Sequence, residues 1–218
     1  PASILKPYLK NSLNFPFELS GSVMQGAISS EHFQKVSWQV SPLYLLLAKV
    51  SAQIRVKIDS NNQINSVAEI SPFSKPELKQ IKGEVTTQYL QKFWPATPFL
   101  FNTNIQIKQA NVKWDEGFPT NLPSESEGSL VLTNVDLLGE GIGDYQFVFK
   151  YLDQSLVGNI TSTSNSSLDA TLKLGINPQR LLTLTGEILP KTIALKLIFK
   201  ELNTNLNPNI SYQLPPFP

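Results

Sequence analysis

The 218-residue chain contains no cysteine, one histidine and one methionine, and these shortages exclude several kinds of chemistry. Without cysteine there is neither a disulfide nor a thiolate metal site. A Ser-His-Asp triad would have to use His32, which lies in a polar stretch before an expected strand, and no G-x-S-x-G motif occurs. A glycosidase would need two carboxylates across a cleft, and no such pair is indicated. The sequence therefore predicts a protein that is not an enzyme and binds no cofactor or metal.

Charge is also scarce. Charged residues make up 16% of the chain and the formal net charge is +1, which argues against nucleic acid as a partner. The charge is unevenly distributed: residues 1–113 carry a net charge of +6 and residues 114–218 a net charge of −5. The simpler interpretation is drift along a solvated surface. The alternative is a basic end that faces an anionic surface such as lipid headgroups.

No apolar run approaches the ~20 residues that span a bilayer. The longest, Leu43 to Ala48, is far too short, and no signal peptide is present. Because the chain begins abruptly at Pro1, the loss of an N-terminal targeting or anchoring segment stays open as an expectation.

The stretch from Gly128 to Phe199 is dominated by alternating apolar and polar residues. Successive side chains of a strand point to opposite faces, so each run has one apolar face and one polar face. Several such runs in succession predict an antiparallel sheet with one covered side. The apolar positions are Tyr145, Phe147, Phe149 and Tyr151; Leu168, Ala170, Leu172, Leu174 and Ile176; and Leu182, Leu184, Gly186 and Ile188.

We therefore predict an all-β, mainly antiparallel fold with one or two short helices. The sheet is expected to be twisted and curved, or to form a partly open β-sandwich or half-barrel. The breaker at 94–98 is a candidate internal boundary within a single β-rich domain spanning 1–218, with parts 1–94 and 99–218. Helix is expected for Thr86 to Phe93, while Leu78 to Glu84 is left open as strand.

In the N-terminal half, the alternation predicts that one set of side chains is more buried than its neighbours Ser51, Gln53, Arg55 and Lys57. That set comprises Val50, Ala52, Ile54, Val56 and Ile58. Before it, Ser41 and Pro42 are expected to open a short helical turn. The turn should bury Leu43, Leu45, Leu46 and Leu47, with Trp38 packed in the core nearby. The segment from Gly139 to Gly143 predicts a β-turn with glycines at positive φ, not a phosphate loop.

The order of several short motifs resembles the type II secretion system protein N family. The residues concerned are Val23 to Gly26, Val36 to Leu43, Gly128-Ser129, Val135 to Gly139, Gly143-Asp144-Tyr145, Leu168 to Leu172, Gly186 and Asn209 to Leu214. Within them, Trp38, Pro42, Gly143, Asp144 and Tyr145 are taken as structural positions. The resemblance covers residues 19–214. It implies a non-enzymatic accessory subunit with a periplasmic domain and an N-terminal inner-membrane anchor. The family is in turn distantly similar to AsmA-type envelope proteins, whose curved sheets present an apolar groove.

Two functions stay open. In the first, strand edges or a groove dock other secretion-system subunits. In the second, the sheet binds lipid or another hydrophobic ligand, which needs an apolar groove open to solvent. The supply of large apolar side chains favours a face that the chain closes itself. The candidate interface or groove residues are Trp94, Trp114, Val50, Ile54, Val56, Leu172, Leu174 and Leu184. The oligomeric state stays open.

Overall fold

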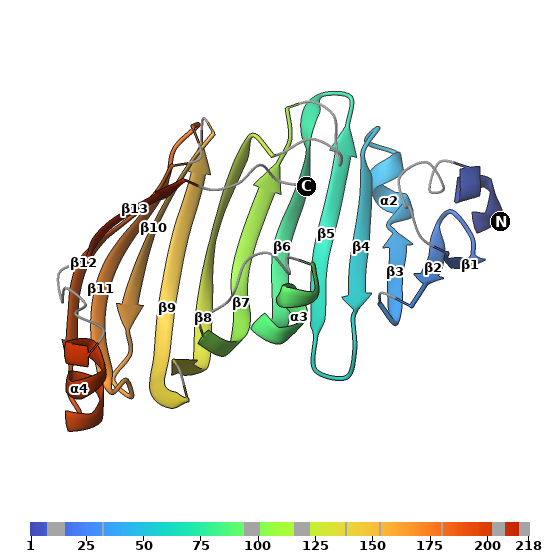
Figure 1. Cartoon of the computed structure of the whole chain (residues 1–218). Coiled ribbons are helices and arrows are strands. Elements are labelled where there is room, and N and C mark those ends of the chain that lie inside the picture. Colours follow the sequence, from blue (N-terminus) through green and yellow to red (C-terminus); the bar gives the residue numbers. More distant parts are fainter. Residues whose placement is uncertain are drawn as a thin grey trace. The chain divides into compact units, whose positions relative to one another are not determined.

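The computed structural model describes residues 1–7, 16–31, 33–93, 101–115, 123–137, 139–152, 154–179, 181–201 and 208–213. Within these residues the all-β prediction is confirmed, because thirteen strands form a sheet in which neighbouring strands are antiparallel where the pairing is described (Figure 1). Three short α-helices accompany the strands, which is more than the one or two expected. The strands lie in the sheet in the same order as in the sequence.

The elements follow one another with short connections. They are η1 (Ala2–Leu5), β1 (Glu18–Gly21), β2 (Gln25–Ser29), β3 (Lys35–Val40), α2 (Pro42–Leu45), β4 (Val50–Lys57), β5 (Gln63–Ser71), β6 (Ser74–Thr86), α3 (Thr87–Phe93), β7 (Phe101–Lys113), β8 (Glu125–Leu137), β9 (Glu140–Leu152), β10 (Ser155–Ser162), β11 (Leu168–Ile176), β12 (Leu181–Pro190), α4 (Ile193–Glu201) and β13 (Asn209–Gln213).

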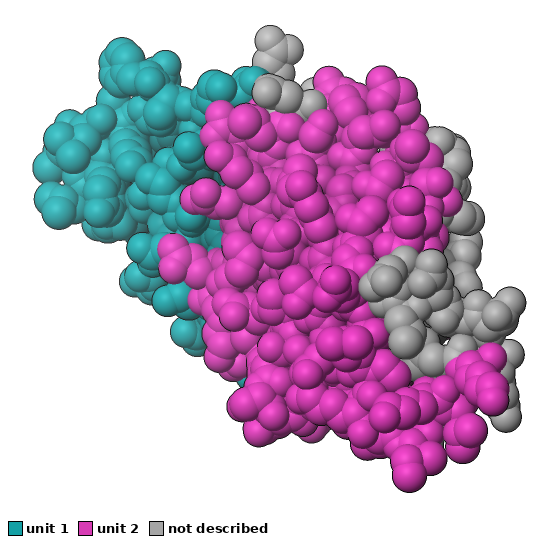
Figure 2. All heavy atoms as spheres, turned by 90° about the vertical axis from the view of Figure 1, so that its left-hand side faces the viewer, with its two compact units in different colours: residues 1–85, 110–123 teal, residues 86–109, 124–218 magenta. Residues whose placement is uncertain are grey.

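The chain divides into two compact units (Figure 2). Unit 1 contains residues 1–85 and 110–123, and unit 2 contains residues 86–109 and 124–218. The candidate boundary at 94–98 lies outside the described residues. The helix expected from Thr86 to Phe93 is observed as α3, one residue shorter, and the segment left open as strand belongs to β6.

In unit 1, strand β4 shows the predicted alternation over most of its length. Ala52, Ile54 and Val56 are half-buried, Ile58 is buried, and the polar residues between them are exposed. The order is reversed at the start of the strand, where Val50 is 41% exposed and Ser51 is 6% exposed. Ser51 lies opposite Glu69 on β5, and its carbonyl oxygen accepts a hydrogen bond from the backbone N–H of Ser41. Local polar packing therefore overrides the alternation there.

The expectation for α2 is wrong in one respect. Pro42 occupies the first turn as predicted, but the side chain of Ser41 makes no capping hydrogen bond. The four leucines are not buried: Leu43, Leu45, Leu46 and Leu47 are 69%, 44%, 83% and 69% exposed. The helix has only four residues, so it cannot lay a continuous apolar stripe across the sheet.

Unit 2 contains a small closed core. Its buried members come from β8, β9, β11 and α4, and they are Val135, Ile142, Tyr145, Leu168, Ala170 and Leu195. Helix α4 corrects a second expectation, because the alternating ladder was predicted to continue to Phe199. Thr192 begins the helix by accepting a hydrogen bond from the Leu195 N–H through its side-chain oxygen (3.3 Å). Leu195 is 2% exposed and covers one end of the core.

Candidate functional site

The segment Gly143-Asp144-Tyr145 fixes the way in which β8, β9 and β11 meet. The β8–β9 register shifts between Leu132 and Val135, and Asn134 within the shift has a φ of +53°. The Asp144 carboxylate accepts a hydrogen bond from the Asn134 N–H (2.8 Å), which stabilises this irregularity. Gly143 has a φ of +102°, and a Cβ there would lie 2.5 Å from the Ser166 Cα. The predicted positive φ is confirmed at Gly139 and Gly143.

Tyr145 holds the closed core together through its hydroxyl. It is 4% exposed, and its Oη lies 2.8 Å from the Leu168 carbonyl oxygen and 3.1 Å from that of Ile142. Burial raises the pKa of this phenol to about 12, and the negative charge of Asp169 adds to the effect, while a hydrogen bond with Ser166 opposes it. A neutral donor is therefore maintained where two backbone acceptors converge. Gly143, Asp144 and Tyr145 are structural positions, as predicted.

Trp38 is half-buried and not fully enclosed. Its indole Nε1–H donates to the Val23 carbonyl oxygen (2.9 Å), and its ring lies so close to Gly26 that a Cβ there would collide with it. The leucines of α2, which were expected to pack beside it, are exposed. Trp38 therefore ties β3 to the β1–β2 turn and is not the centre of a core.

Three of the predicted groove residues come together in unit 2. Cross-strand pairing places Leu174 opposite both Gly158 and Leu184, while Leu172 is opposite Ile160. We call this surface the unit 2 apolar face; it is formed by Leu130, Phe147, Phe149, Ile160, Leu172, Leu174, Leu184 and Ile210. The rings of Phe147 and Phe149 stack with centroids 5.7 Å apart.

Cover on this face is uneven. Leu172, Leu174 and Leu184 are half-buried, and Ile210 is 48% exposed. The fully buried residues gather instead around Tyr145 and Leu195. Helix α4 therefore closes one end of the face, while the rows through Leu174 and Leu184 are only partly covered by described residues.

The other predicted groove residues are dispersed. Ile54 and Val56 lie half-buried on β4 in unit 1, Val50 is exposed, and Trp114 is 7% exposed. Trp114 is therefore a buried residue of unit 1 and does not form an exposed rim. Trp94 lies outside the described residues, as does His32.

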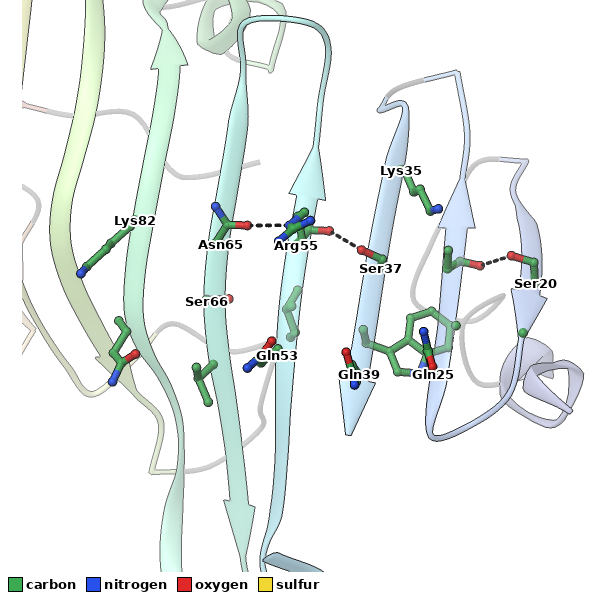
Figure 3. A pocket seen from close by; sticks show the side chains of 17 residues that line it. Ser20, Gln25, Lys35, Ser37, Gln39, Gln53, Arg55, Asn65, Ser66 and Lys82 are labelled. Carbon is green, nitrogen blue, oxygen red and sulfur yellow. Dashed lines mark hydrogen bonds between the residues drawn. The ribbon is translucent and has the colours of Figure 1, made fainter. Parts of the chain in front are cut away.

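A polar hollow on unit 1 was not anticipated. We call it the trough; it has a volume of about 820 Å³ and is lined by β1 to β6 (Figure 3). Its cations are Lys35, Arg55 and Lys82, and the Arg55 Nε–H donates to the Asn65 Oδ1 (3.0 Å). The polar half of the β4 alternation was the available signal, but bringing the cations together requires the register of five neighbouring strands.

Beside the trough, four charged side chains neutralise one another. Lys49 Nζ lies 2.6 Å from Glu69 Oε2, and Lys79 Nζ bridges Glu69 (2.8 Å) and Glu77 (2.6 Å). Burial alone would raise the pKa of Glu69, but hydrogen bonds from Lys49 and Lys79, with their positive charges, lower it overall. The hydrogen bond to Glu69 is the largest cause that raises the pKa of Lys79. We call these residues the Glu69 cluster.

Two searches of the described residues concern metals and membranes. No group of three or more histidine, aspartate or glutamate side chains converges there as ligands of a metal ion. None of the described helices has the length and apolar character needed to cross a bilayer.

Comparison with known proteins gives one family match. The model of the family described as type II secretion system (T2SS), protein N, matches residues 18–203. This range contains Trp38, the trough, the Glu69 cluster, Tyr145 and most of the unit 2 apolar face. No curated protein and no solved structure shows a significant match to the chain.

Proposed function

This chain belongs to the type II secretion system protein N family, and from that premise we propose that it is a non-enzymatic subunit that assembles with other subunits of the system. The proposal includes a periplasmic location and an inner-membrane anchor N-terminal to the chain shown. The chemistry required of such a subunit is recognition, and the surfaces that can supply it are strand edges and incompletely covered faces.

The observation that carries this proposal is the edge strand β13. It pairs with β12 through Leu181–Gln213 to Thr185–Asn209, and no described strand pairs with its other side. An edge strand presents backbone N–H and C=O groups that a partner strand can satisfy. The opposite edge, β1, has only four residues and contacts η1. We therefore propose that β13 is the edge used for docking.

Site-specific crosslinking in cells that contain the complete secretion system tests this proposal. A photoreactive residue replaces Ser211, which is exposed on β13; matched positions are Ser20 on β1 and Gln146 on the interior strand β9, both also exposed. We expect Ser211 alone to capture a defined secretion subunit, identified by mass spectrometry. Equal capture at Gln146, or capture of no secretion subunit at Ser211, would overturn docking at this edge.

A second candidate function, binding of lipid or another hydrophobic ligand, is favoured by the uneven cover of the unit 2 apolar face. Large side chains left half-exposed at Leu172, Leu174 and Leu184 forgo part of the ~1.5–3 kcal/mol that full burial of each would contribute. An acyl chain could supply the missing contacts. The neighbouring closed core shows how the same sheet is sealed where α4 crosses it.

A photoactivatable phospholipid added before purification from membranes separates the two candidates. Lipid binding predicts stoichiometric adducts between Leu168 and Ile188, and substitution Leu174→Gln should reduce them severalfold. A matched change on the polar face, Thr183→Gln, should leave the yield unchanged, because Thr183 is exposed on the same strand pair. Adducts spread evenly over both units, or none at all, would exclude a lipid site on this face.

A further inference from the structure

The trough on unit 1 is a binding site in its own right, independent of the proposed assembly edge. Two cross-strand rows form its floor. The first runs through Ser20, Ala27, Ser37, Arg55, Asn65 and Lys82 on six successive strands. The second contains Gln25, Gln39, Gln53 and Val67. Strands in a sheet are about 4.8 Å apart and side chains on one face about 7 Å apart along a strand. The rows therefore make a regular polar grid (Figure 3).

The electrostatics of the trough favour an anion. Lys35, Arg55 and Lys82 are exposed, and no aspartate or glutamate occurs among the 17 lining residues. Glu69 and Glu77, which lie farther along β5 and β6, are already paired with Lys49 and Lys79. Asn65 holds the Arg55 guanidinium through its Nε, which leaves the terminal nitrogens of Arg55 available as a fork for a carboxylate or phosphate.

The uncharged lining favours a ligand rich in hydroxyl groups. Side-chain amides donate and accept hydrogen bonds, as hydroxyls do. The trough provides five amides, from Gln25, Gln39, Gln53, Asn65 and Gln80, together with the hydroxyls of Ser20, Ser37 and Ser66. Sugar hydroxyls have the same dual capacity. A grid that alternates amides with cations therefore matches a chain that carries both hydroxyls and negative charges.

Two other polymer classes fit less well. An extended peptide gains affinity by adding a strand to a free edge, but β2 to β5 each have a neighbouring strand on both sides. Peptide and nucleic-acid sites also use aromatic anchors or base-stacking platforms. Trp38 and Ile54 border the trough but occupy the alternate positions of β3 and β4, which a strand directs to its other face.

We propose that the trough binds an acidic polysaccharide strand, laid across β2 to β6, with its carboxylate or phosphate groups on Lys35, Arg55 and Lys82 and its hydroxyls on the glutamine row. Binding should weaken with added salt, because exposed cations contribute the charge recognition.

Calorimetric titration of the full chain with oligogalacturonate tests the proposal. The trough variant combines Lys35→Gln, Arg55→Gln and Lys82→Gln. Its matched control removes three exposed cations of unit 2 through Lys150→Gln, Lys173→Gln and Lys196→Gln. We expect the trough variant to bind at least about tenfold more weakly and the control to bind within about twofold of the unaltered chain. Thermal unfolding of both variants checks that folding is retained, and Gln39→Ala with Gln53→Ala tests the hydroxyl contacts without changing charge.

Three companion ligands make the result decisive. Neutral dextran of equal length should not bind, and a teichoic-acid fragment should bind if phosphate can replace carboxylate. Tighter binding of a poly-glutamate peptide, or of a thymidine oligonucleotide, would overturn the polysaccharide assignment in favour of that polymer. An equal loss in the trough variant and its control would show only non-specific charge attraction and would also overturn the proposal.

Discussion

Helices α2 and α4 are both short and leucine-rich, yet they meet their sheets in opposite ways. In unit 2, α4 inserts Leu195 into a closed core with Tyr145 and Leu168, and the side chain is 2% exposed. In unit 1, α2 leaves Leu46 83% exposed. Its surroundings are held instead by polar contacts: the Lys49 ammonium lies 5.6 Å from the Tyr44 ring centroid and pairs with Glu69.

The difference shows that apolar composition alone does not bury a helix. The nine residues of α4 give more than two turns, so an apolar stripe can face the sheet, whereas the four residues of α2 give about one. Unit 2 is consequently sealed by burial and unit 1 is fastened by charge at these places. The two ends should respond differently to truncation, alkali and acid.

The largest expected effect is on α4. Leu195→Ala should lower the free energy of unfolding by about 2–5 kcal/mol, because it leaves a cavity in a closed core. The matched substitution Leu46→Ala on the loop after α2 should change it by less than about 0.5 kcal/mol, since that side chain is exposed. Urea titration of both variants measures the contrast. Equal losses would show that the Leu46 surface is buried in solution.

A smaller effect is expected from alkali. The pKa of Tyr145 is raised to about 12 from an unfolded value of about 10, so the folded protein retains this proton more tightly. The associated stability is fully present below pH 10 and is lost as the pH rises through 12, to the extent of about 2–3 kcal/mol.

Tyr145→Phe should therefore remove this part of the alkaline destabilisation. It should also cost about 1–3 kcal/mol at neutral pH, because two backbone acceptors lose their shared donor. Denaturant unfolding from pH 8 to 12 measures both consequences. A parallel pH profile in the variant would mean that other tyrosines dominate; Tyr151→Phe, on the same strand, is the control.

The smallest effect concerns the Glu69 cluster. The pKa of Glu69 is lowered from its ordinary value of 4.5, so its stabilising contribution is present above that pH and is lost as the pH falls through the folded value. Glu69→Gln should cost about 1 kcal/mol at pH 7, and less in high salt. Unfolding midpoints at pH 7 and pH 3.5 test the sign. A variant that loses more stability than the unaltered chain on acidification would contradict it.

Much of the β structure follows from local patterns. Alternation correctly predicts the two faces of β4 from Ala52 to Ile58, and the β-branched residues before Thr87 yield to helix where expected. Helix α4 was missed because alternating apolar residues run up to Pro190 and the ladder was extended through it. Thr192, followed by the strong helix formers Ala194, Leu195 and Lys196, was the signal for a new element.

The sites depend on features that local patterns do not encode. The trough needs Lys82 to lie beside Asn65, and this register follows an irregularity in β6 where Gln80 has a φ of +52°. The exposure of the α2 leucines likewise depends on which surfaces lie within reach, and not on their own sequence. By contrast, Leu172, Leu174 and Leu184 could be grouped in advance, because consecutive antiparallel strands juxtapose them.

The identity of strand order and chain order has a kinetic consequence. Each new strand finds its partner in the strand that precedes it, so the loop to be closed stays short and the entropic cost of closure stays small. The sheet can therefore zip hairpin by hairpin. A chain delivered N-terminus first can fold each strand onto the edge just formed, and no segment has to wait for a distant partner.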